Sequence, residues 1–265
     1  MTMDLGLKDK VALVAAASRG LGRAVAEELA AEGASLILCA RDPATLAETA
    51  ASIADSTGAH VLAVPADVTQ VDQITRLVDA GAARFGRIDI LITNAGGPPT
   101  GRFDQLTREQ WEEGSRLTLF SAIELTRQVI PGMRQRRWGR ILNITSIAVK
   151  QPIPNLMLSN SLRAGLTGFA RTLANEVAAD GVTVNNIMPG YTATERVEDL
   201  AQELAEKQGL SAADVRATWE QEIPMRRLGQ PREFAALATF LVSERAGYIT
   251  GTSIQIDGGW IRSLL

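Results

Sequence analysis

The feature that most constrains the fold is a regular alternation of short apolar runs with longer amphipathic segments. The short runs are apolar throughout, which is typical of strands buried on both faces of a parallel sheet, and the longer segments have helical periodicity. Right-handed crossovers between such strands predict a Rossmann-type, doubly wound α/β domain of about seven strands with helices on both faces. The predicted strands are 11–15, 35–40, 60–65, 88–93, 140–145, 183–188 and 253–256, and the predicted helices are 21–32, 44–56, 71–85, 108–136, 155–178 and 233–243.

No linker rich in Pro, Gly or Ser interrupts the chain and no internal repeat is present, so residues 1–265 are predicted to form one domain. One segment departs from the alternation. Residues 194–228 are highly charged and contain two helical patterns, at 197–207 and 212–221, without a strand between them. Because this segment follows a strand end, where α/β sheets bind ligands, we interpret it as a mobile helical lid. The alternative is a surface helical hairpin with no role in binding.

Composition excludes several classes of function. The net charge of −3 and the pI near 5.4 argue against nucleic acid as a partner. No apolar stretch approaches the roughly 18 residues that span a bilayer, and the first residues do not resemble a signal peptide. The single cysteine, Cys39, cannot form an intramolecular disulfide, and a cytoplasmic location is expected. The single histidine, His60, lies in a predicted strand, so we expect no histidine-based triad and no metal site.

A turn suited to a phosphate follows the first predicted strand. Gly20 and Gly22 would let the backbone turn tightly and approach a pyrophosphate, while the next helix points its N–H groups at the charge. Arg41 follows the second strand, where this fold meets the 2′ position of the ribose. An arginine there suits the 2′-phosphate of NADP, and Arg19 can reach the same group. Although Asp42 is adjacent, the pair of arginines favours NADP(H) over NAD(H); the alternative is that they are only surface residues.

Further markers follow the later strands in order. They are Asp67-Val68, Asn94-Ala95-Gly96, Ser146, and Pro189-Gly190 with Thr192 and Thr194. With the glycine turn, this set resembles the short-chain dehydrogenase/reductase family, especially its 3-oxoacyl-[acyl-carrier-protein] reductase-like branch, from residue 7 to residue 259. The resemblance implies an NADP-dependent oxidoreductase in which Ser146 polarises the substrate carbonyl. The residues assigned to the dinucleotide, from the turn and from the resemblance, are Ser18, Arg19, Gly20, Leu21, Gly22, Arg41, Asp67, Val68, Asn94, Ala95, Gly96, Arg163, Pro189, Gly190, Thr192 and Thr194.

The chain departs from the family pattern at the centre of the site. The family's catalytic tyrosine aligns with Ser159, thirteen residues after Ser146, and its lysine aligns with Arg163. The helix asparagine that orders a relay water aligns with Thr118. The glycine motif opens with alanines instead of Thr-Gly, and because alanine resists a positive φ, Ala16 must alter the turn or carry strain.

These substitutions change the expected chemistry. A serine hydroxyl is a far weaker acid than a phenol, so Ser159 cannot replace a tyrosine as an efficient general acid. Arg163 keeps its charge and can donate hydrogen bonds to a ribose or an oxyanion, but it cannot shuttle a proton, so we expect water to supply it. One helical turn separates the two residues, which should line one cavity with Ser146. The catalytic candidates are Ser146, Ser159, Arg163, Thr118 and Lys150, and the further candidates for substrate contacts are Asn155, Asn160, Tyr191 and Arg196.

Lys150 is either an acid or carboxylate anchor or simply a solvated loop lysine. Three functions remain open: an NADP-dependent reductase of a small carbonyl or acyl-thioester substrate, a non-redox lyase or isomerase that stabilises an enolate, and a catalytically silent binding or assembly protein. The resemblance also implies a homodimer or homotetramer, formed through the long helices 108–136 and 155–178, the last strand and the C-terminal residues 260–265.

Overall fold

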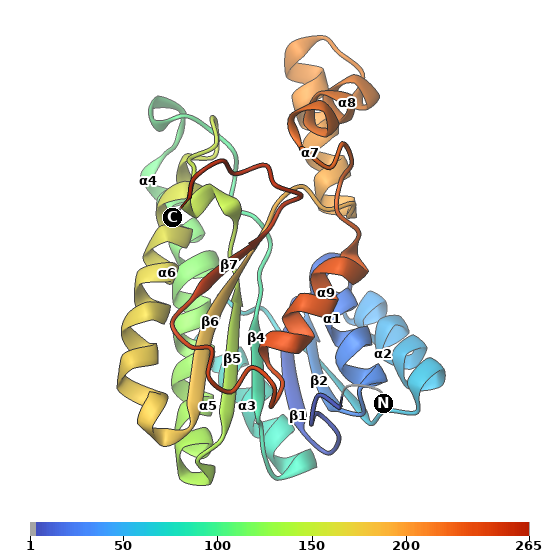
Figure 1. Cartoon of the computed structure of the whole chain (residues 1–265), viewed down its shortest axis with the longest axis vertical. Coiled ribbons are helices and arrows are strands. Elements are labelled where there is room, and N and C mark those ends of the chain that lie inside the picture. The colour runs from blue at the N-terminus through green and yellow to red at the C-terminus, as the bar shows by residue number, and fades with distance from the viewer. Residues whose placement is uncertain (1–3, 265) are drawn as a thin grey trace.

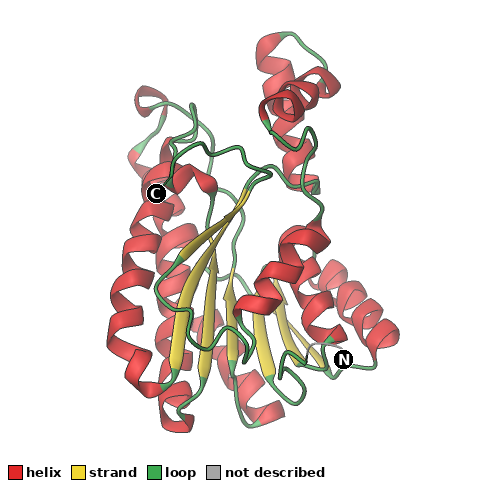
Figure 2. Ribbon diagram, viewed as in Figure 1, coloured by secondary structure: helices red, strands yellow, loops and turns green. Residues whose placement is uncertain are grey.

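The computed structural model describes residues 4–264, and its centre is one parallel sheet of seven strands in the order β3-β2-β1-β4-β5-β6-β7 (Figures 1 and 2). The doubly wound sheet predicted from the sequence is confirmed. Residues 1–3 and 265, the ends of the proposed single domain, lie outside the described part. The strands are β1 Val11–Ala15, β2 Ser35–Ala40, β3 Val61–Pro65, β4 Ile90–Thr93, β5 Gly139–Ile144, β6 Val182–Pro189 and β7 Ser253–Ile256.

Nine α-helices cover the sheet or extend from it within the described residues. One prediction needs correction: the segment 108–136 is not one regular helix, because a π-helical turn, η2 Arg116–Phe120, separates α4 from α5. The hydroxyl of Ser121, the first residue of α5, donates a hydrogen bond to the carbonyl of Leu117 in this turn. The helices are α1 Gly20–Ala31, α2 Pro43–Thr57, α3 Val71–Phe85, α4 Arg108–Ser115, α5 Ser121–Arg136, α6 Met157–Val177, α7 Glu195–Gln208, α8 Ala212–Glu222 and α9 Pro231–Leu241.

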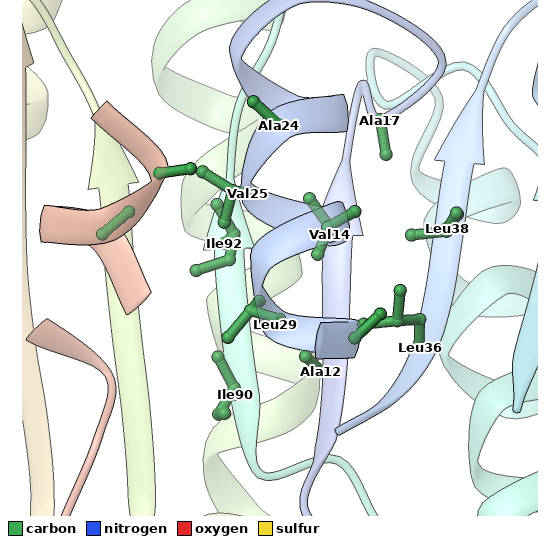
Figure 3. Packing of buried hydrophobic residues seen from close by; sticks show 14 of the residues in the cluster. Ala12, Val14, Ala17, Ala24, Val25, Leu29, Leu36, Leu38, Ile90 and Ile92 are labelled. Atoms are coloured by element: carbon green, nitrogen blue, oxygen red, sulfur yellow. The ribbon is translucent and has the colours of Figure 1, made fainter. Parts of the chain in front are cut away.

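The core has two layers because strand side chains alternate between the faces of the sheet. On one face, α1, α2 and α9 pack on residues such as Val14, Leu36 and Ile92 (Figure 3). On the other, α3, α5 and α6 pack on residues such as Leu13 and Ile141. This uninterrupted burial makes the carboxyl ends of the strands a rigid edge on which loops can hold a site.

The segment predicted as a lid is a pair of helices, α7 and α8, that projects beyond the carboxyl edge of the sheet (Figure 1). It has a small apolar core of its own, including Ala201, Val215 and Trp219. The chain segments that lead into α7 and out of α8 meet where Thr192 pairs with Gly229 in an isolated parallel bridge. Its mobility stays a prediction.

No helix between residues 4 and 264 combines the length and apolar character needed to cross a membrane.

Candidate active site

A cleft of about 980 Å³ opens along the carboxyl edge of the sheet, where the strand order reverses between β1 and β4. The first turn of α1 and the loops after β2 and β3 line one end, and the loop after β5 with the start of α6 lines the other. Helix α7 lines its outer side through residues such as Arg196 and Leu200. This is the position at which doubly wound sheets bind ligands.

The turn after β1 brings the backbone at Gly22 close to the carbonyl of Ala16. A Cβ on Gly22 would lie 2.3 Å from the carbonyl oxygen of Ala16, so only glycine fits there. Asn94 donates to the same carbonyl at 3.4 Å, and Thr49 donates to the carbonyl of Ser18 at 2.9 Å. The N-terminus of α1 has no side-chain cap, which leaves its first N–H groups available to an anion.

Ala16 adopts the left-handed conformation, with φ of 49°. Of the two predicted outcomes, an altered turn or strain, the positive φ favours strain, because alanine here accepts a conformation that disfavours side chains.

We expect Ala16→Gly to raise the free energy of unfolding by about 0.5–1 kcal/mol, because relief of the strain exceeds the entropy that glycine adds to the unfolded chain. Urea unfolding measures the change. The neighbouring Ala17 is buried and has no positive φ, so Ala17→Gly should destabilise the protein instead. A loss of stability in Ala16→Gly would contradict the assignment of strain.

Arginines gather at the end of β2. Arg19 and Arg41 both line the cleft there. Asp42, which seemed to oppose a phosphate, has a structural role: its carboxylate accepts a 2.7 Å hydrogen bond from the Thr45 N–H and caps α2. Hydrogen bonding with the Thr45 side chain and then with its backbone N–H, and to a smaller extent the charge of Arg19, lower the pKa of Asp42. The two arginines therefore line the cleft beside a carboxylate that is already hydrogen-bonded.

The cleft collects almost all of the dinucleotide candidates from six separate segments. Gly22 is the exception, since it supports the turn from behind without lining the cleft. Asp67 is held by a turn in which its carboxylate accepts from the N–H and the hydroxyl of Thr69, each at 2.9 Å. The candidates that line the cleft are Ser18, Arg19, Gly20, Leu21, Arg41, Asp67, Val68, Asn94, Ala95, Gly96, Arg163, Pro189, Gly190, Thr192 and Thr194.

Ser146, Ser159 and Arg163 line the other end of the cleft together. The hydroxyl oxygen of Ser146 accepts from the N–H of Ala148 at 3.1 Å, which leaves its O–H free to donate. Arg163 donates through Nη1 to the carbonyls of Ile144 and Thr145, both at 2.9 Å. Burial lowers the pKa of Arg163 to about 10, so it remains a cation at neutral pH. The site thus pairs two hydroxyls with a positioned positive charge.

Thr118 lies in the π-helical turn and does not line the large cleft. It lines a separate cavity of about 10 Å³, together with Asn94, Ser121 and Arg163. Its hydroxyl is buried and has no hydrogen-bond partner among the described residues. A cavity of this size and polarity suits one water molecule, so Thr118 is connected to the site only through the cavity that it shares with Arg163.

Three other candidates lie elsewhere. Lys150 is exposed at the end of the short helix η3 Ile147–Val149, and Asn155 is exposed in the loop before α6; neither lines the cleft. Asn160 uses its side-chain amide on the backbone of Ile153, accepting from its N–H at 3.3 Å and donating to its carbonyl at 3.0 Å. Sequence reasoning missed this role because a polar side chain near a site gives no indication of whether it faces the ligand or the loop.

The chain has two tyrosines. Tyr191 lines the cleft, whereas Tyr248 is fully exposed. The ring of Tyr191 stacks on Trp219 with 4.2 Å between centroids and also contacts Trp260 at 5.1 Å. Burial, with the negative charge of Glu222, raises its pKa to about 12. A phenol in that state is a poor proton donor, so Tyr191 does not supply the acid that Ser159 lacks.

Comparisons with known proteins agree with this geometry. The family model described as enoyl-(acyl carrier protein) reductase matches residues 15–261. The 3-oxoacyl-[acyl-carrier-protein] reductase of Haemophilus influenzae is 35% identical over 253 residues, which are 96% of this chain and 98% of that protein. The chain belongs to the short-chain dehydrogenase/reductase family.

Solved structures of this family superpose on nearly the whole chain. L-sorbose reductase from Gluconobacter frateurii, in complex with NADPH and L-sorbose, has a TM-score of 0.94 and 35% identity, covering 99% of this chain and 100% of that chain. A variant of actinorhodin polyketide ketoreductase with NADPH has a TM-score of 0.92 and 29% identity, covering 99% of this chain and 100% of that chain.

Among the described residues, no cluster of His, Cys, Asp or Glu is suited to a metal ion.

Proposed function

We propose that this protein is an NADP-dependent oxidoreductase that reduces a small carbonyl substrate without a tyrosine acid. The observation that carries the proposal is a single cleft that is lined by nearly all of the dinucleotide candidates and, at its far end, by Ser146, Ser159 and Arg163. Reductases are found among its relatives, and two of the similar structures contain NADPH. The alignment of Ser159 and Arg163 with the family's tyrosine and lysine is part of this proposal.

The residues present fit NADP(H). The uncapped N-terminus of α1 and the tight turn that Gly22 supports suit the pyrophosphate, and Arg19 and Arg41 suit the 2′-phosphate. The loop from Pro189 to Thr194 suits the nicotinamide end. When bound, the cofactor would supply the hydride.

The remaining chemistry falls to the chain's own residues. The Ser146 O–H donates to the substrate oxygen and polarises the carbonyl. The Arg163 cation stabilises negative charge that develops on that oxygen. Neither residue gives up a proton, and the open cleft admits water, which we propose as the proton source. A reductase of this kind would be slower than one with a positioned acid.

One observation favours a second function. A partly buried cation beside two hydroxyls also suits an enolate intermediate, as in a retro-aldol lyase or an isomerase. In that case the nucleotide would be structural. The homodimer or homotetramer expected from the family stays a prediction.

The deciding experiment titrates NADPH and NADH against the protein and then follows NADPH absorbance with a panel of ketones and 3-oxoacyl thioesters. We expect NADPH to bind more tightly than NADH and to be oxidised slowly. Binding without turnover would exclude the reductase and leave the lyase, isomerase and silent protein; no binding of either nucleotide would contradict the cofactor assignment as well.

Arg41→Ala should weaken NADPH binding roughly 10- to 100-fold, the usual size of a lost charge-assisted hydrogen bond, and should leave NADH affinity nearly unchanged. Calorimetric titration with each nucleotide measures the difference. Arg76→Ala is the matched control, because Arg76 lies on the exposed face of α3 in an ion pair with Asp72 and does not line the cleft. Equal losses for both nucleotides would show that Arg41 does not contact the 2′-phosphate.

A further inference from the structure

The end of the cleft beside Ser146 and Ser159 has apolar walls. They come from four segments: the loop after β4, the π-helical turn η2, the short helix η3 and the loop before α6. Three of the side chains, Leu117, Ile153 and Leu156, remain partly exposed, so apolar surface is still open to a ligand. The wall residues are Pro98, Leu117, Ile147, Ile153 and Leu156.

The walls of this apolar chamber are held in place by hydrogen bonds. Asn160 fixes the backbone of Ile153 on both its N–H and its carbonyl. Leu156 pairs with Gly101 in an isolated parallel bridge, and Gly101 donates to the carbonyl of Asn155 at 2.6 Å. The two loops therefore form one structure before any ligand arrives, which lowers the entropic cost of binding.

Charge at this end gives an anionic ligand no net attraction, because the two carboxylates of α7 balance the two arginines, Arg196 and Arg163. Helix α7 contributes Arg196 to the cleft but also Glu195 and Asp199, so its lining is negative overall. Arg196 also lies 3.7 Å from Glu203. Arg163 is the remaining cation, and its Nη1 is engaged by two backbone carbonyls. The hydroxyls of Ser146 and Ser159 are suited to one carbonyl oxygen rather than to a chain of sugar hydroxyls.

We propose that the chamber binds a neutral ketone with a compact apolar body, such as a cyclic ketone. The carbonyl oxygen meets Ser146, and the ring lies against Leu117, Ile153 and Leu156. This substrate class rests on the proposed carbonyl reductase function, but binding to the chamber is measurable without turnover.

The first test is a size series of cyclic ketones, from cyclopentanone to cyclooctanone, titrated by ligand-observed NMR in the presence of saturating NADP⁺. The oxidised cofactor prevents reduction. Affinity should rise about fourfold for each added methylene until the chamber is full. L-sorbose and 2-oxohexanoate serve as the polyhydroxylated and anionic probes and should bind more weakly than cyclohexanone. A flat size dependence, or tighter binding of either probe, would overturn the proposal.

The second test replaces wall residues with a polar side chain of similar size. Leu156→Asn and Leu117→Asn should each weaken cyclooctanone binding roughly tenfold, through lost apolar contact, while NADPH affinity stays unchanged. Leu210→Asn is the matched control, because Leu210 is exposed between α7 and α8 and does not line the cleft. Unchanged ketone affinity in both wall variants, or an equal loss in the control, would contradict the chamber.

These results separate the two proposals. Size-dependent ketone binding without NADPH oxidation would support the chamber and reject the reductase. NADPH oxidation by other carbonyl substrates, without size-dependent ketone binding, would support the reductase and reject the chamber.

Discussion

The double variant Ser159→Tyr/Arg163→Lys is expected to reduce a small open-chain ketone about 10²- to 10⁴-fold faster than the parent protein, which is the usual contribution of a positioned general acid. Ser159 and Arg163 lie one helical turn apart on α6 and both line the cleft, so a phenol and an ammonium would occupy the same end as Ser146. The neighbouring cation lowers the pKa of the phenol from roughly 10 toward neutrality. Steady-state NADPH oxidation measures the gain.

The structure limits what the double variant has to accommodate. A lysine ammonium at position 163 can still donate to the carbonyl of Ile144 or Thr145, which Arg163 now contacts. The new ring narrows the apolar chamber, which is why a small ketone is the appropriate substrate. The control Ser159→Phe/Arg163→Lys places a ring without an acid, and it should show no gain. A second control, Ser161→Tyr, places a tyrosine at an exposed position of α6 and should also leave the rate unchanged.

An unchanged rate in a folded double variant that still binds NADPH would mean that the site has been rebuilt for other chemistry. The lyase or isomerase function would then be preferred. A gain shared by the phenylalanine control would point to cavity filling instead of proton transfer.

The sheet was predictable because strands that are buried on both faces consist of short, almost entirely apolar runs. The runs at β1 and β2 are apolar at nearly every position, and their ends in the structure match the predicted ends. The two helices of the lid were also predicted from periodicity. The π-helical turn was not predicted, since Thr118 and its neighbours fit a regular helical pattern. The additional residue in this turn does not visibly change the spacing of apolar residues in the sequence.

Sequence reasoning named candidate residues that share one cleft, but it could not give the direction of their side chains. Order and spacing along the chain placed Ser146, Ser159 and Arg163 at one end of the cleft. The same reasoning could not show that the Arg163 guanidinium bonds to backbone carbonyls, or that Asn160 holds a loop. Such partners come from segments far apart in the sequence, and only the packed structure decides which of them meet. Lys150 illustrates the limit: it follows Ser146 closely and yet lies outside the cleft.

Gly22→Ala is expected to weaken NADPH binding about 10- to 100-fold and to lower the free energy of unfolding by about 1–3 kcal/mol. The added Cβ would lie 2.3 Å from the Ala16 carbonyl oxygen and 2.9 Å from the Asn94 amide nitrogen. Because the first of these is a backbone atom in a turn already strained at Ala16, the turn must shift as a whole. The shift would move Arg19 and the N-terminus of α1 away from their present positions in the cleft.

Calorimetric titration with NADPH and urea unfolding measure the two effects of Gly22→Ala separately. Gly168→Ala is the matched control: it lies on the exposed face of α6, where an added Cβ meets no atom within 4 Å, and it should be neutral or slightly stabilising. If Gly22→Ala lost stability but bound NADPH as tightly as the parent, the turn would be structural only, and the nucleotide would have to bind elsewhere in the cleft. If it lost affinity with little change in stability, the shape of the turn that Gly22 supports would be serving the cofactor, in agreement with the conformational strain tolerated at Ala16.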